Sequence, residues 1–209
     1  MACCEDRVRG TLSTISAVAA GVATLCTAIG SAGASVSRTA LQDMHWITAV
    51  SSGNPIMQKG DIFAGFNAIY VKGVDDDVVK YIDCVDDADV CETCSSVSVG
   101  ITTMLVFSTI VGLCTCMFCI VSICKPRWYF TCAAFGMISL VLAASSLGSF
   151  DNCFYAFQDQ EGVSNVKYNG GSSIVIASTV VMTASVVLSA MGLYLENRDD
   201  GAGSSVFPS

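Results

Sequence analysis

Ionisable side chains are missing from four long stretches of this 209-residue chain. Residues 11–33, 95–124, 128–150 and 172–195 contain no Asp, Glu, Lys, Arg or His. A bilayer core of roughly 30 Å takes about 20 apolar residues in a helix, and a backbone inside lipid must satisfy its own hydrogen bonds. We therefore expect four membrane-spanning helices and an integral membrane protein.

Charge is scarce in the chain as a whole. It is 13% charged and 53% hydrophobic, with a mean hydropathy of +0.61, whereas a soluble domain carries about 25% charged residues. A soluble fold is therefore disfavoured. Because roughly half of the residues lie in the spans, no separate catalytic domain fits in the remainder.

The charge that is present is unevenly distributed. Residues 34–94 hold ten acidic and four basic side chains, which makes nucleic acid an unsuitable partner. The basic residues closest to the spans are Arg7, Arg9, Lys125, Arg127 and Arg198. Because basic flanks stay on the cytoplasmic side, we expect both termini in the cytosol. We expect the plasma membrane to be the location of the protein.

The expected organisation follows from these flanks. It comprises a cytoplasmic N-terminus (1–10), a first span (11–33), extracellular loop one (34–94), a second span (95–124), a cytoplasmic turn (125–127), a third span (128–150), extracellular loop two (151–171), a fourth span (172–195) and a cytoplasmic tail (196–209). The alternative is that residues 1–33 are a cleaved signal peptide. The apolar stretch there is longer than the 7–15 residues of a signal peptide, which favours the span.

Small residues recur at four-residue spacing in the first span, as at Ala17 and Gly21 or Ala19 and Ala23. Such spacing lets a neighbouring helix approach closely. We expect this helix to pack inside the bundle; a dedicated dimer motif is the alternative.

Twelve cysteines fall into three groups. Cys84, Cys91, Cys94 and Cys153 lie on the expected oxidising side, where disulfides form, and their pairing is open among three possibilities. One bond within loop one and one between the loops is geometrically reasonable. A metal site is the alternative, because Cys91 and Cys94 have C-x-x-C spacing, but the expected extracellular loops contain neither a second such pair nor paired histidines.

The other cysteines lie within or beside the spans. Those inside the spans, such as Cys119 and Cys132, are expected to behave as small hydrophobic residues. Cys3, Cys4 and Cys124 lie at the expected cytoplasmic boundary, where reversible palmitoylation takes place. The residue after the initiator is Ala2, which excludes N-myristoylation.

Residues suited to catalysis are sparse. His45 is the single histidine of the chain, and intramembrane proteases, ion-coupled transporters and proton relays place ionisable groups in their spans. The acidic runs 75–77 and 86–89 lack the ligand spacing of an EF-hand. We therefore expect no enzyme activity, no metal and no cofactor.

Loop one contains the pattern of a small sheet. Residues 45–50, 62–72 and 78–84 are rich in β-branched and aromatic side chains and are separated by Gly-, Asn- and Asp-containing turns, which is typical of short antiparallel strands. Loop two, rich in glycine, is expected to be less ordered. The expected fold is an all-α membrane protein: a four-helix transmembrane bundle with a small extracellular β-sheet in loop one.

This arrangement resembles the claudin-like tetraspan superfamily, which includes claudins, fungal cortical patch proteins and trypanosomatid amastins. Members carry a loop-one tryptophan followed by a Gly-Leu-Trp element and a pair of cysteines. Trp46 and Gly65-Phe66 occupy comparable places, whereas Asn67 stands where the second tryptophan falls and Tyr70 where the first cysteine falls. The resemblance covers the topology of the chain and implies the fold more than an activity.

The expected function is lateral or cell-surface association without catalysis, with membrane lipid, further copies of the chain or other membrane proteins as partners. Phe63, Phe66 and Tyr70 are the candidate contact residues, because exposed apolar groups rimmed by charge mark association surfaces. In a single strand, Phe66 and Tyr70 share one face and Phe63 points to the other. The alternative function is an oligomeric channel or a channel's auxiliary subunit. A membrane enzyme or transporter would need a polar intramembrane site, which the sequence does not contain.

Overall fold

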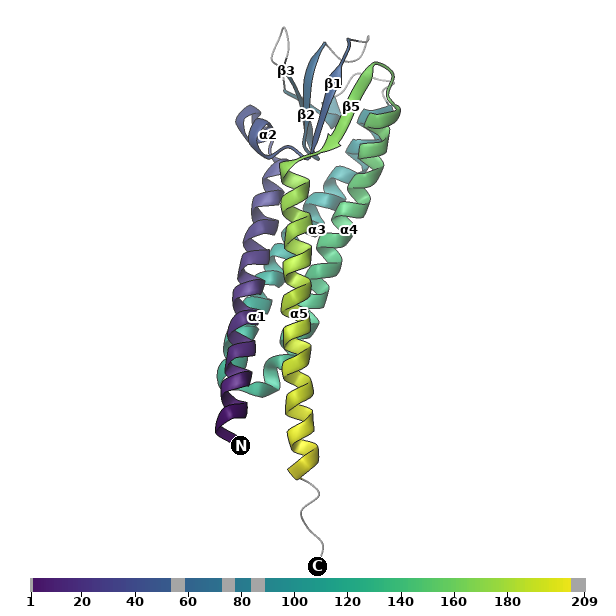
Figure 1. The fold of residues 1–209 in the computed structure, drawn as a ribbon. Coiled ribbons are helices and arrows are strands. Elements are labelled where there is room, and N and C mark those ends of the chain that lie inside the picture. The colour runs from purple at the N-terminus through teal and green to yellow at the C-terminus, as the bar shows by residue number, and fades with distance from the viewer. Residues whose placement is uncertain (1, 54–58, 73–77, 84–88, 204–209) are drawn as a thin grey trace, which may run out of the picture. The chain divides into compact units, whose positions relative to one another are not determined.

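Four long helices dominate the structure. It is a computed structural model that describes residues 2–53, 59–72, 78–83 and 89–203. The long helices, labelled in Figure 1, are α1 (Ala2–Gly30), α3 (Asp89–Cys124), α4 (Tyr129–Asp159) and α5 (Gly170–Gly203).

The length and composition of these helices suit a membrane. Within the described part of the chain, four helical segments are long and apolar enough to cross one: Gly10–Ala34, Val90–Cys124, Tyr129–Asp159 and Gly170–Arg198. This confirms the expectation of four long apolar helices and indicates a multi-pass membrane protein. All four helices run beyond the expected spans. In α3 and α4 the added turns carry Val90, Cys94, Cys153 and Phe157, which are buried in the core beside the sheet.

A five-stranded antiparallel sheet accompanies the helices. Its strands are β1 (Ile47–Ser51), β2 (Gly60–Ala64), β3 (Ala68–Lys72), β4 (Val78–Lys80) and β5 (Val163–Tyr168), in the order β4-β3-β2-β1-β5. Short helical segments complete the fold: η1 (Ser31–Ala34), α2 (Arg38–Met44), η2 (Tyr81–Asp83) and η3 (Pro126–Trp128). The small sheet expected in loop one is therefore present.

Two expectations for the loops were wrong. The segment 62–72 is a hairpin rather than one strand, because the chain turns after Ala64 and the Gly65 N–H bonds the Ala68 carbonyl. The segment 151–171 is ordered: α4 continues to Asp159, and β5 pairs with the free edge of β1 (Figure 1). Gly162, with a φ of 79°, makes the turn into β5, a conformation that glycine adopts without strain.

The chain divides into two compact units. The helical unit comprises Met1–Leu25, Ser108–Val141 and Ser178–Ser209, and the sheet unit comprises Cys26–Phe107 and Leu142–Ala177. The core of the sheet unit is built around Trp46, which is fully buried against Phe66 and Phe150. In the helical unit, small side chains fill the core, including Ala20 and Ala23 at 0% exposure.

The small-residue face of α1 packs inward. Ala17, Ala20 and Ala23 are buried, whereas the bulky apolar side chains of Ile15, Val18, Val22 and Leu25 are exposed. Close helix packing is what small residues permit, so this face is used within the chain, as expected.

Candidate functional site

A cluster of buried hydroxyl groups lies in the helical unit and joins all four helices. Ser16 of α1 is its hub: its Oγ lies 2.9 Å from Ser185 Oγ and 2.8 Å from Ser189 Oγ, both on α5. Ser185 donates back to the Ser16 carbonyl at 2.9 Å. Since an unpaired hydroxyl is costly in an apolar environment, these reciprocal bonds hold α1 against α5.

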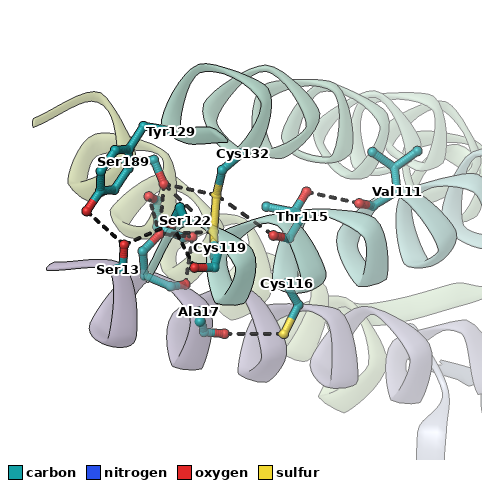
Figure 2. The surroundings of a disulfide bond; sticks show 12 residues. Ser13, Ala17, Val111, Thr115, Cys116, Cys119, Ser122, Tyr129, Cys132 and Ser189 are labelled. Atoms are coloured by element: carbon teal, nitrogen blue, oxygen red, sulfur yellow. Dashed lines mark hydrogen bonds between the residues drawn. A yellow bond between two sulfur atoms is a disulfide. The ribbon is translucent and has the colours of Figure 1, made fainter. Parts of the chain in front are cut away.

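The same cluster continues to α3 and α4 (Figure 2). Ser13 Oγ donates to the Tyr129 hydroxyl at 2.8 Å and lies 2.8 Å from Ser122 Oγ. Ser122 donates to the Cys119 carbonyl at 2.7 Å. Ser13, Ser16, Ser122 and Tyr129 are each exposed by 2% or less, so the cluster is closed to solvent.

A disulfide between Cys119 of α3 and Cys132 of α4 borders this cluster, as Figure 2 shows. The Cys132 sulfur lies 3.2 Å from Ser189 Oγ. This corrects the expectation that both cysteines act only as small hydrophobic residues. The sequence holds one signal for the pair, because Cys119 and Cys132 lie at similar distances on either side of the tight turn at 125–127.

The chemistry of the cluster favours helix packing. Hydroxyls that bond one another, with no carboxylate or amine beside them in the apolar spans, supply neither a general base nor a fixed charge. No group of three or more His, Cys, Asp or Glu side chains lies within reach of one metal ion in the described part of the chain.

In the sheet unit, two of the three expected contact residues are buried. Phe66 is 1% exposed and meets Trp46 edge to face, with ring centroids 5.0 Å apart. Tyr70 is 0% exposed, packs with Leu41 of α2, and has the Arg38 guanidinium 5.2 Å from its ring centroid. Neither side chain is available as a contact surface, which corrects that expectation.

The pairing of these rings also differs from the expectation. Phe63 and Tyr70 face each other across β2 and β3 and stack with centroids 5.7 Å apart, whereas Phe66 lies in the turn between the strands. Phe63 is partly buried and also meets His45 edge to face at 4.9 Å. The prediction failed because it treated a hairpin as one strand.

Exposed apolar side chains are found instead beside the outer strand β4. Ile82 in η2 is 83% exposed and Val79 in β4 is 38% exposed. In the described residues β4 pairs with β3 alone, so one side of this strand has no strand partner there. Neither residue was among the expected contact residues, although three of the five side chains in 78–82 are β-branched.

The four cysteines expected to form disulfides are placed as follows. Cys94 of α3 and Cys153 of α4 are bonded to each other, with Cα atoms 4.8 Å apart, and both are buried. Cys91 is also disulfide-bonded, and Cys84 lies outside the described residues. Because Cys91 and Cys94 are oxidised, their C-x-x-C spacing offers no thiolate to a metal.

The candidate lipidation sites are only partly described. Cys124, at the end of α3, is an exposed free thiol. Cys3 and Cys4 lie in the first turn of α1, but their side chains are outside the described part.

A polar network joins the two loops at the start of α5. His45 Nδ1 lies 2.9 Å from the Gln42 carbonyl, His45 Nε2 lies 3.0 Å from Thr48 Oγ1, and Asn169 Nδ2 contacts both Nε2 and Thr48 Oγ1. Burial lowers the pKa of His45, a shift opposed by backbone hydrogen bonds and by Asp43. Nearby, burial and a hydrogen bond to Asp151 raise the pKa of Tyr168.

Comparison with known proteins adds no relative. The sequence matches no family model, and no curated protein matches it.

Proposed function

We propose that this chain is a non-enzymatic, claudin-like four-span membrane protein that acts through lateral or cell-surface association with further copies of itself. Both termini lie in the cytosol, the five strands of the sheet lie outside, and the plasma membrane is the site of action. The basic residues beside the spans support this orientation.

The exposure of Ile82 carries this proposal. Ile82 is 83% exposed outside the apolar spans, and it lies next to an outer strand, whose unpaired edge is a template for pairing with another chain. We define the β4 patch as Val79 and Ile82. Lys80, which lies between them in the sequence, is also exposed.

A second copy of the chain is the partner that best fits the patch. The helical unit uses its polar and small side chains for internal packing and turns bulky apolar side chains outward, which suits lipid. Lateral contact between copies therefore falls to the sheet unit. An outer strand paired to its own symmetry mate forms a closed two-fold contact.

The test compares a substitution in η2, next to the edge strand β4, with one on the opposite edge strand β5. Ile82→Asp places a charge in the β4 patch, whereas Ser164→Asp places one on exposed β5. We expect Ile82→Asp to lower the oligomeric fraction on blue-native gels several-fold and Ser164→Asp to leave it unchanged, with both variants delivered to the cell surface. Equal oligomer fractions would exclude the β4 patch as the contact.

An oligomeric channel, or a channel's auxiliary subunit, is the alternative. The hydroxyl cluster in the helical unit is closed to solvent, which favours a pore between copies over one through a single copy. Purified protein in liposomes distinguishes the two: the association proposal expects no conductance above that of empty vesicles.

A further inference from the structure

The position of every proton around His45 follows from its neighbours. The backbone N–H of Gly170 donates to Asn169 Oδ1 at 2.8 Å. An N–H group only donates, so the atom it meets must be the amide oxygen. Asn169 therefore turns its NH₂ group toward His45, and this amide orientation is fixed by the start of α5.

The histidine tautomer follows in turn. Asn169 Nδ2 donates to His45 Nε2, so Nε2 must offer a lone pair and carry no proton. The ring proton is then on Nδ1, where it donates to the Gln42 carbonyl at 2.9 Å. In the neutral ring with its proton on Nδ1, both ring nitrogens therefore have a hydrogen-bond partner. A proton on Nε2 would instead point at the hydrogens of the Asn169 NH₂ group.

We infer that His45 is a pH-operated latch between loop one and the start of α5. In its neutral form the ring accepts the Asn169 hydrogen bond and holds the two segments together. In its protonated form Nε2 becomes a donor, the bond to Asn169 is lost, and Thr48 Oγ1, 3.0 Å away, accepts from Nε2 instead. This inference is independent of the proposed association.

The latch loosens the junction without unfolding it. Backbone bonds from Asn169 N to the Trp46 carbonyl, at 2.9 Å, and from Gly171 N to the His45 carbonyl, at 3.1 Å, do not depend on pH. Acidification therefore removes one of the two side-chain bonds that tie Asn169 to loop one, whereas the bond from Asn169 Nδ2 to Thr48 Oγ1, at 2.7 Å, remains.

The surrounding charges set the direction of the effect. Asp43 on α2 favours the protonated ring, while burial, the larger influence, opposes it. On β5, Lys167 pairs with Thr48 in the register, β2 contributes the ring of Phe63, and residues 169–173 at the start of α5 are not ionisable.

The sign of the pH dependence follows. Since the latched ring binds its proton more weakly than a free one, the latch is fully stable above pH 6.5, the ordinary pKa of histidine, and loses stability as the pH falls below it.

Nuclear magnetic resonance of the full chain in lipid nanodiscs tests the latch, because His45 is the single histidine. We expect the ¹⁵N chemical shifts of the imidazole at pH 7.5 to show a protonated Nδ1 and an unprotonated Nε2. The midpoint of the imidazole titration should lie below pH 6.5. Hydrogen exchange at residues 169–173, corrected for intrinsic rates, should rise several-fold between pH 7.5 and pH 5.

Two variants sharpen the test. Asn169→Asp keeps an oxygen for the Gly170 N–H and places a carboxylate oxygen against Nε2, so the midpoint should rise by about one unit or more. His45→Gln cannot titrate and should abolish the pH dependence of exchange. A proton on Nε2 at pH 7.5 in the wild type, or exchange with the same pH dependence in His45→Gln, would overturn the latch.

Discussion

The indole of Trp46 lies directly against the backbone of Gly171. A Cβ atom at residue 171 would come within 2.6 Å of the ring nitrogen and within 2.7 Å of the Met44 carbonyl oxygen. Gly33 packs on the same ring in a similar way, so the tryptophan of loop one contacts two glycines from different parts of the sheet unit.

Gly171→Ala should therefore destabilise the sheet unit by about 1–3 kcal/mol, the usual cost of overpacking a filled core. Thermal unfolding in detergent, followed by Trp fluorescence, measures the change. Gly148→Ala is the matched control, because nothing lies within 4 Å of the added Cβ there. An unfolding temperature for Gly171→Ala no lower than that of Gly148→Ala would show that Trp46 is not packed as described.

Loss of the Cys94–Cys153 disulfide should lower stability by about 2–4 kcal/mol. Non-reducing peptide mapping of the wild type is expected to recover the two cysteines in one linked peptide. The double substitution Cys94→Ala with Cys153→Ala is compared with Cys26→Ala, since Cys26 is a free thiol in the same unit. Recovery of Cys94 and Cys153 as alkylated thiols would disprove the bond.

Ser16→Ala removes the hub of the hydroxyl cluster and leaves its α5 partners short of a bond. Interhelical hydrogen bonds in membranes contribute about 0.6 kcal/mol each on average, so a loss of about 1–2 kcal/mol is expected. Thr14→Ala is the control, because the Thr14 hydroxyl is exposed and bonds the carbonyl of Gly10 in its own helix. Unfolding in mixed micelles should separate the two variants; equal stabilities would mean that the cluster does not hold α1 to α5.

Acylation at the cytoplasmic boundary is a separate prediction. Cys124 is exposed at the end of α3, so thioester-specific labelling after hydroxylamine should decrease in Cys124→Ser. Cys114, a half-buried thiol in the middle of α3, provides the control substitution. Unchanged labelling in Cys124→Ser would leave Cys3 and Cys4 as the candidate sites.

Sequence patterns predicted the helices well because lipid imposes a simple requirement. A stretch with no ionisable side chain and enough length has few alternatives to a spanning helix, and the four apolar helices follow from composition alone. The strands of loop one were recognisable for a related reason, since β-branched runs between turn residues favour short strands.

The parts that failed depend on contacts between distant segments. The sequence of β5 is polar and flanked by glycine, which is typical of a loop. It forms a strand because it pairs with the edge of β1 that β2 leaves free. Phe66 was assigned to a strand face because the turn at Gly65 was missed, and its burial depends on Trp46. The hydroxyl cluster joins Ser13 and Ser16 to residues more than a hundred positions away, which no local pattern reveals.

Site-specific photo-crosslinking in native membranes tests the proposed association most directly. A photoreactive residue at position 82 is compared with one at position 164, on the opposite edge strand of the same sheet. The account predicts a crosslinked product of two copies of this chain from position 82 and none from position 164. Crosslinks of equal yield from both positions, or products from position 82 that contain no second copy, would contradict it.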